Sequence, residues 1–149
     1  MRILVVGSGA REHAIVKALI RTGSARVDIV CAPGNDRIGL EVEVRPEVIA
    51  TDPLAVVKCA LEERIDLAII GPEAPLVAGV ADSLRAQGIA VFGPSQKAAM
   101  LEGSKQFAKE IMASADVPTG MARECSTMAE VESAIDQFCL LYTSPSPRD

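Results

Sequence analysis

The first fourteen residues, MRILVVGSGAREHA, constrain the fold more than any other stretch of this chain. Residues 3–6 form a short, unbroken apolar run rich in β-branched side chains, which is typical of a central parallel strand covered on both faces. Gly7 and Gly9 then allow a tight turn, and charged residues begin a helix directly after it. This arrangement predicts a strand, turn and helix whose backbone N–H groups can hold a phosphate at the helix N-terminus.

Glu12 stands where the dinucleotide-binding pattern G-x-G-x-x-G has its third glycine. A carboxylate at this position repels a pyrophosphate, although it can accept hydrogen bonds from ribose or amine groups. The strand predicted at residues 26–32 also lacks the terminal acidic residue that binds the ribose of NAD. We therefore expect a small phosphorylated metabolite as the ligand, and an NAD-binding module is kept as an alternative.

The composition narrows the class of protein. A chain of 149 residues with 49% hydrophobic content can bury one α/β core and the beginning of a second unit. Basic and acidic residues are well mixed at a net charge of −5, which argues against a nucleic-acid surface. No apolar run approaches the roughly 20 residues that cross a bilayer, and no signal peptide is recognisable, so we expect a cytoplasmic protein without a membrane partner. The four scattered cysteines form no CxxC pair, which predicts buried thiols rather than a zinc site or disulfides.

Strands and helices are predicted to alternate along the first two thirds of the chain. Strands are expected at residues 3–6, 26–32, 43–50, 66–70 and 89–92, with helices at 11–22, from Pro53 onward, and at 76–87. This alternation predicts a Rossmann-like parallel sheet of five strands with helices on both faces. After Pro94 it stops, and helices are predicted at 95–100, 103–115 and 128–138.

Two further turns are expected at the carboxyl edge of this sheet, where ligands of α/β proteins bind. The turn at residues 33–36, PGND, either lines the site or is a plain turn. The segment GPEAPLVAGVAD, residues 71–82, presents Glu73 on a loop stiffened by proline. This carboxylate is suited to holding a hydroxyl or amine group of a ligand. The alternative is that Glu73 is a solvated acid in a turn. We expect Gly9 and Glu73 to share one cleft.

Five segments, in this order and spacing, resemble one known family. They are GSGAREHA at residues 7–14, APGN at 32–35, GPEAPLVAGVAD at 71–82, FGP at 92–94 and LEGSK at 101–105. Together they are similar to the N-terminal part of the phosphoribosylamine–glycine ligases, also called glycinamide ribonucleotide synthetases. The resemblance extends from the first residue to about residue 138.

The resemblance implies an ATP-grasp ligase of de novo purine synthesis. Such an enzyme joins glycine to 5-phosphoribosylamine while ATP is cleaved to ADP and phosphate, with Mg²⁺ or Mn²⁺ bound between nucleotide and protein. It implies a Rossmann-like substrate domain over residues 1–100 and the start of an ATP-grasp domain over residues 101–138. The expected partners are these small molecules, with no nucleic acid, and the expected state is a monomer.

The same resemblance implies where the substrates bind. The residues expected to hold the phosphoribosyl substrate are Gly7, Gly9, Ala10, Arg11, Glu12 and Glu73. Lys105 matches a lysine that reaches the nucleotide phosphates in the family. No catalytic residue and no metal ligand is assigned within the chain. For His13 we expect packing or a hydrogen bond to a neighbouring loop rather than a role as proton carrier.

Residues 139–149, CLLYTSPSPRD, depart from the family and resemble the translation of a transposase-type sequencing adapter. We expect this tail to be non-native and disordered. The ATP-covering loop and the metal-binding carboxylates of the family do not follow, so the 149-residue chain is expected to lack ligase activity. Three alternatives remain: the corresponding domain of another ATP-grasp enzyme, a nucleotide-binding Rossmann module, and a non-catalytic interaction domain.

Overall fold

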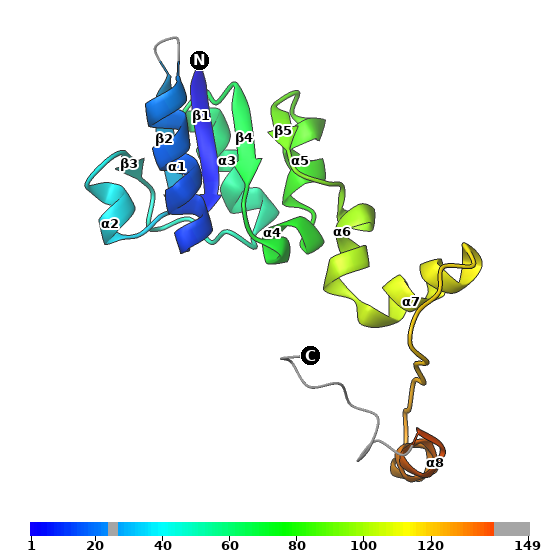
Figure 1. The fold of residues 1–149 in the computed structure, drawn as a ribbon. Helices are drawn as coiled ribbons and strands as arrows, with labels where there is room; N and C mark the ends of the chain where they lie inside the picture. Colours follow the sequence, from blue (N-terminus) through cyan, green and yellow to red (C-terminus); the bar gives the residue numbers. More distant parts are fainter. Residues whose placement is uncertain (24–26, 139–149) are drawn as a thin grey trace. The chain divides into compact units, whose positions relative to one another are not determined.

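A computed structural model describes residues 1–23 and 27–138, which fall into two units. The first unit, Met1–Lys105, contains the sheet and is called the sheet unit below; the second begins at Gln106. The proposed non-native tail at residues 139–149 lies outside the described residues. The sheet unit is an α/β structure, as the alternation of strands and helices predicted (Figure 1).

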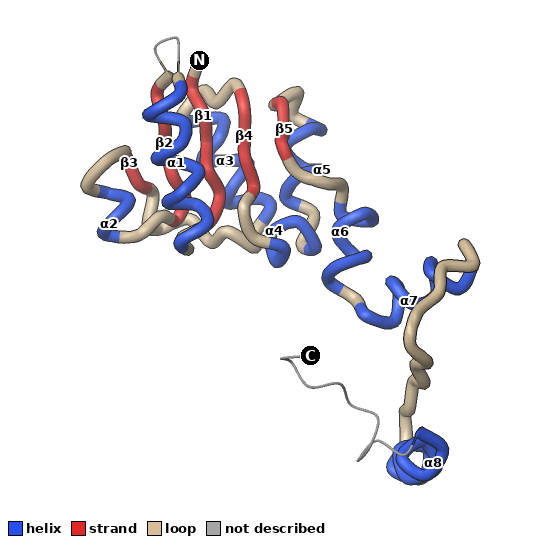
Figure 2. The backbone as a smooth tube through the Cα atoms, in the orientation of Figure 1, coloured by secondary structure: helices blue, strands red, loops and turns tan. Residues whose placement is uncertain are grey.

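All strands of the sheet run parallel, in the order β3-β2-β1-β4-β5 (Figure 2). The strands are β1 (Arg2–Gly7), β2 (Asp28–Pro33), β3 (Glu43–Val44), β4 (Leu67–Ile70) and β5 (Ala90–Phe92). The apolar β1 lies at the centre, where Val5 is paired with Cys31 of β2 and with Ile69 of β4. The predicted five-stranded parallel sheet is therefore confirmed.

Alternate residues of β1 enter two hydrophobic cores, one on each face of the sheet. Ile3 and Val5 belong to the core under α1 (Ala10–Thr22) and α2 (Asp36–Gly39). Leu4 and Val6 belong to the larger core under α3 (Pro53–Glu62) and α5 (Val80–Ala86). Figure 1 shows the two sets of helices on opposite faces. Burial on both faces explains why the β1 sequence is continuously apolar rather than alternating.

Three local predictions are corrected by the structure. The single helix expected at residues 76–87 is divided into α4 (Glu73–Val77) and α5, because Gly79 between them adopts a left-handed conformation with φ of 87°. The strand expected at residues 43–50 shortens to two residues, since Pro46 lacks the N–H that a ladder requires. The turn expected at 33–36 leads into the short α2, which the Asn35 side chain caps.

The helices predicted after Pro94 are present with shifted ends. They are α6 (Gln96–Gly103), α7 (Lys105–Ser114) and α8 (Met128–Phe138). Within the sheet unit α6 packs against α4, where a Cβ on Gly103 would lie 2.5 Å from Cγ2 of Val77. Across residues 1–23 and 27–138, no helix combines the length and the apolar character that a membrane span requires.

Candidate functional site

The Glu12 side chain folds back onto the turn that precedes its own helix. Its Oε2 accepts a hydrogen bond from the Gly9 N–H at 2.6 Å, and the residue is only 3% exposed. Gly9 is the N-cap of α1 and Glu12 occupies the third helical position, so this bond is the glutamate half of a capping box. The Gly9 N–H is therefore engaged within the protein, while Ala10 and Arg11 carry first-turn N–H groups without an intrahelical acceptor.

Three glycines form the walls around the Glu12 carboxylate. A Cβ on Gly71 would lie 2.0 Å from Glu12 Oε1, and one on Gly9 would lie 3.0 Å from Oε2. A Cβ on Gly7 would lie 2.6 Å from Glu12 Cγ, and Gly7 has a φ of 132°, which side chains rarely adopt. We call this enclosure the Glu12 niche. Gly71 was not among the predicted site residues, although a glycine directly after a strand is the signal for a close approach.

Arg11 joins the β1–α1 turn to the β4–α4 turn. Its Nη1 donates to the Gly71 carbonyl at 2.8 Å and lies 3.7 Å from Glu73 Oε2. Both side chains are more than half exposed, so the ion pair itself contributes little stability. Glu73 was predicted on a loop, but it is the first residue of α4. The structure thus brings Gly9, Arg11, Glu12 and Glu73 to one edge of the sheet.

The turn after β2 lies against the same glycine turn. Gly34 N–H donates to the Gly7 carbonyl at 3.1 Å, and Asn35 Nδ2 donates to the Ser8 carbonyl at 2.6 Å. The segment thus contacts the predicted phosphate-binding backbone, and whether it lines the site stays a prediction. The turn after β1, residues 7–12, and the turn after β4, residues 71–73, are together called the seat below.

Lys105 is not joined to the seat. It is exposed, begins α7, and has no hydrogen bond or ion pair with the described residues of the seat. Its assignment to nucleotide phosphates stays a prediction.

His13 lies in the first turns of α1 but contacts a neighbouring loop. Its Nε2 is 2.9 Å from Oε1 of Glu41, and Lys17 Nζ is 3.4 Å from the same oxygen. The hydrogen bond with His13, followed by that with Lys17, holds the pKa of Glu41 below its ordinary value. The predicted contact of His13 with a neighbouring loop is confirmed.

The buried thiols lie in the core rather than in a reactive setting. Burial raises the pKa of Cys31 to about 11, and the nearby Glu12 charge acts in the same direction. Cys59 is also buried, and its pKa is raised mainly by that burial. Cys125 is only partly buried, which corrects the prediction that all four thiols are buried. Cys139 lies outside the described residues.

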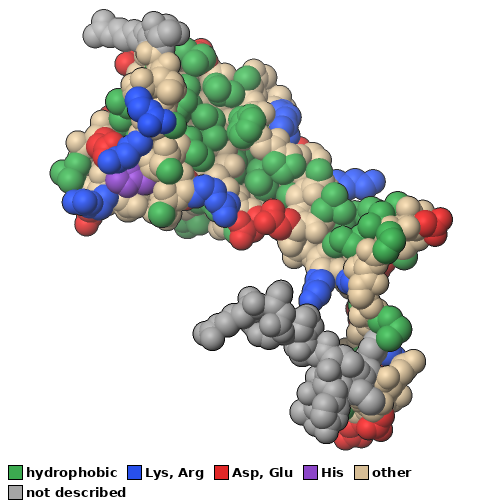
Figure 3. Space-filling view, in the orientation of Figure 1, with side chains coloured by type: hydrophobic (Ala, Val, Ile, Leu, Met, Phe, Trp, Pro, Cys, Tyr) green, Lys and Arg blue, Asp and Glu red, His purple; other side chains and the backbone are tan. Residues whose placement is uncertain are grey.

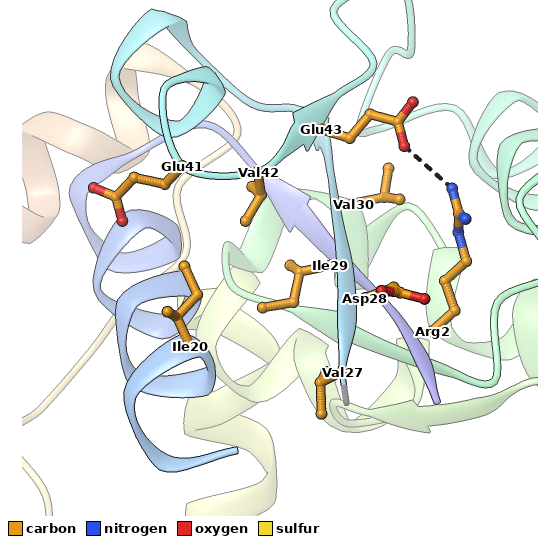
Figure 4. A pocket seen from close by; sticks show the side chains of 9 residues that line it. All are labelled: Arg2, Ile20, Val27, Asp28, Ile29, Val30, Glu41, Val42 and Glu43. Atoms are coloured by element: carbon orange, nitrogen blue, oxygen red, sulfur yellow. Dashed lines mark hydrogen bonds and ion pairs between the residues drawn. The ribbon is translucent and has the colours of Figure 1, made fainter. Parts of the chain in front are cut away.

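A separate groove of about 360 Å³ opens at the amino ends of β1 and β2 (Figure 4). Its lining residues are Arg2, Ile20, Val27, Asp28, Ile29, Val30, Glu41, Val42 and Glu43. Arg2 Nη2 lies 3.2 Å from Glu43 Oε2 and also pairs with Glu63, which in turn pairs with Arg45. Because Arg2 begins β1 and Gly7 ends it, this groove lies at the opposite end of the strand from the seat.

The described residues offer no ready metal site. Across residues 1–23 and 27–138, no three His, Cys, Asp or Glu side chains gather as ligands for a metal ion. Charges of both signs are interspersed over the visible face of the sheet unit (Figure 3). The seat itself consists of backbone N–H groups, the buried Glu12 carboxylate and the exposed Arg11–Glu73 pair.

Comparison with known proteins gives a consistent match. Residues 1–102 match the family described as phosphoribosylglycinamide synthetase, N domain. The chain is 56% identical over 142 residues to a phosphoribosylamine–glycine ligase of Leifsonia xyli, and 50% identical over 145 residues to that of Streptomyces coelicolor. The crystal structure of the Thermotoga maritima phosphoribosylamine–glycine ligase superposes with a TM-score of 0.68 at 25% identity.

The chain covers only part of these relatives. The two matches include 95% of this chain but 34% of each relative, and the superposition covers 92% of this chain and 30% of the Thermotoga protein. What is similar is therefore about one third of a longer polypeptide.

Proposed function

The chain belongs to the family of phosphoribosylglycinamide synthetase N domains, and on this basis we propose that it is the substrate-holding part of a phosphoribosylamine–glycine ligase. The parent enzyme joins glycine to 5-phosphoribosylamine in purine biosynthesis, with cleavage of ATP. In this proposal the seat binds the phosphoribosyl substrate, and the enzyme works as a cytoplasmic monomer. Relatives of this name at 50–56% identity support the assignment.

One observation carries the proposal for the seat: the two turns meet at Gly71, whose carbonyl accepts from Arg11 and which lies against the Glu12 carboxylate. The backbone N–H groups at the start of α1 favour an anion, and α1 has 13 residues, enough for a full helix dipole. The Arg11–Glu73 pair lies at the same edge, where its donors and acceptors can meet the sugar hydroxyls or the amine. A phosphate and a polar sugar are together the chemistry that this edge suits.

We infer that the ligand carries a phosphomonoester rather than a diphosphate. The buried Glu12 engages the Gly9 N–H and puts a carboxylate where dinucleotide-binding folds have their third glycine. A diphosphate bound as in those folds would need the backbone at Gly9, where the second glycine lets the chain approach the pyrophosphate, and it would face the Glu12 charge. A single phosphate needs only the first-turn N–H groups of α1.

Amide NMR of the ¹⁵N-labelled 149-residue chain tests this assignment, with ribose 5-phosphate as the probe. We expect saturable shifts at Ser8, Ala10 and Arg11 with a Kd tighter than about 1 mM, equivalent to about 4 kcal/mol of binding free energy. NAD and inorganic phosphate serve as comparison ligands and are expected to bind more weakly. Absence of shifts at these amides, or tighter binding of NAD, would contradict the proposed ligand class.

We propose that the chain alone does not catalyse the ligation. The family relation implies ATP and Mg²⁺ or Mn²⁺, yet the described residues supply no metal ligand set, and only Lys105 is assigned to the nucleotide. The chain mixed with ATP, Mg²⁺, glycine and phosphoribosylamine is expected to release no phosphate above a blank, and measurable release would overturn this statement.

A further inference from the structure

The Asn35 side chain bonds to two backbone segments at once. Its Oδ1 accepts from the N–H groups of Arg37 and Ile38, both at 2.9 Å, and so caps α2. Its Nδ2 donates to the Ser8 carbonyl at 2.6 Å. The orientation of the amide is fixed by these partners, because the Ser8 carbonyl can only accept and the Arg37 and Ile38 N–H groups can only donate.

The peptide between Ser8 and Gly9 is consequently held at both ends. Its carbonyl accepts from Asn35, and its N–H donates to Glu12 Oε2, each at 2.6 Å. The preceding peptide is oriented in the same way, since the Gly7 carbonyl accepts from the Gly34 N–H at 3.1 Å. Both carbonyls thus face the turn that contains Asn35. In a planar trans peptide the N–H points opposite to the carbonyl, so the Ser8 N–H is directed away from that turn.

The Ser8 N–H is therefore a candidate donor to a bound anion. No hydrogen bond from it is found among the described residues. If the Ser8–Gly9 peptide rotated, its carbonyl oxygen would turn away from Asn35 and could face the seat, where it would repel a phosphate. Gly9 would also leave the extended N-cap conformation, φ −89° and ψ −174°, from which α1 begins.

We propose that Asn35 is a positioning residue for the phosphate: it holds the Ser8 carbonyl away from the seat, while the Gly34 N–H orients the preceding peptide, which carries the Ser8 N–H. This inference rests on the proposed function of the seat. Asn35 lies in the turn between β2 and α2, whereas the residues predicted to bind the ligand lie in the turns after β1 and β4. Asn35 itself does not need to touch the phosphate.

Two substitutions separate this role from the capping of α2. Asn35→Ser keeps a good N-cap acceptor but is too short and lacks the amide donor for the Ser8 carbonyl. Asn35→Ala removes both. The matched control is Asp52→Ala, because Asp52 Oδ1 caps α3 through the same kind of bonds, to Leu54 N at 2.9 Å and Ala55 N at 3.3 Å. Asp52 has no hydrogen bond to the seat among the described residues.

The test is the affinity of each 149-residue variant for ribose 5-phosphate, measured by amide NMR. Loss of one hydrogen bond that orders the seat is expected to weaken binding by about five- to tenfold in Asn35→Ser. The Ser8 carbonyl ¹³C resonance should move upfield in the unliganded variant, which a change in capping alone would not produce. Asn35→Ala and Asp52→Ala should both melt at a lower temperature than the unmodified chain, yet Asp52→Ala should bind within about twofold of it.

The outcomes distinguish this inference from the proposed function. Unchanged affinity in Asn35→Ser, while the unmodified chain binds, would refute the positioning role and leave the phosphate site intact. Equal weakening in Asp52→Ala would also refute it, because general destabilisation would then explain the loss. If the unmodified chain does not bind ribose 5-phosphate, the proposed function fails and this inference fails with it.

Discussion

Replacing Gly71 by alanine would place a methyl group inside the Glu12 niche. The new Cβ would lie 2.0 Å from Glu12 Oε1 and 2.8 Å from its Cδ, far inside the contact distance of real Cβ atoms. Gly71 does not have a φ in the left-handed region, so alanine brings no backbone strain of its own. The carboxylate must leave the niche and lose its bond to the Gly9 N–H. A hydrogen bond to a charged group contributes about 1.5–3 kcal/mol, so we expect destabilisation by about 2–3 kcal/mol.

Hydrogen exchange at the buried amides of Leu4 and Val5 in β1 measures this effect, because exchange there reports the opening of the sheet unit. Gly39→Ala is the matched control, since its Cβ would meet Val44 at an ordinary 3.5 Å and its backbone is not left-handed. That variant should stay within about 0.5 kcal/mol of the unmodified chain.

A double-mutant cycle tests the cause directly. In a Glu12→Ala background the added methyl group at position 71 has no carboxylate to displace, so the second substitution should cost less than about 0.5 kcal/mol. The coupling free energy would then be about 2 kcal/mol. Equal costs of Gly71→Ala in both backgrounds would refute the niche as the reason for this glycine.

Three further predictions concern a carboxylate, a thiol and an ion-pair network. His13→Ala should raise the pKa of Glu41 toward 4.5 in a ¹³C carboxyl titration, because the hydrogen bond with His13 is the main cause of its lowering. Since the folded pKa is the lower one, the Glu41 contribution to stability is present above about pH 4.5 and is lost as the pH falls through the folded value; an unchanged titration would contradict this. Cys31 should resist iodoacetamide in the native chain at about pH 8, where a thiol with a pKa of about 11 is only about 0.1% thiolate, and rapid labelling detected by mass spectrometry would refute its burial. Glu63→Ala should lower the free energy of unfolding by about 1–3 kcal/mol in urea titrations, because this 13% exposed carboxylate holds two arginines, whereas the exposed Glu62→Ala should be nearly neutral.

Local sequence patterns were sufficient to predict the sheet and most of its helices. Continuous apolar runs such as residues 3–6 indicate strands that are buried on both faces, and glycine or proline marks where they end. The division of the helix at Gly79 was missed because an isolated glycine is tolerated in many helices, and only its left-handed φ of 87° shows the break. The edge strand β3 was overestimated because two residues of ladder give almost no periodic signal.

The candidate site was predictable only in part. The sequence places Gly9 and Glu73 at the same sheet edge, because both follow parallel strands, and the structure has them there. It does not indicate that Arg11 reaches the Gly71 carbonyl, a contact across 60 residues that depends on β1 and β4 being neighbours. The Asn35 contact with Ser8 has the same origin, since β2 and β1 must first pair.

The Glu12 side chain explains why a glycine is required at position 71. In dinucleotide-binding domains a glycine at this helix position allows the helix to pack closely against the strand. Here the position carries a side chain, and the space for it is provided by Gly71 in the neighbouring turn. A small residue is thus required after β4, at position 71, rather than at position 12 of α1. It follows that a Glu12→Gly chain should tolerate alanine at position 71, because the glycine there accommodates the Glu12 side chain.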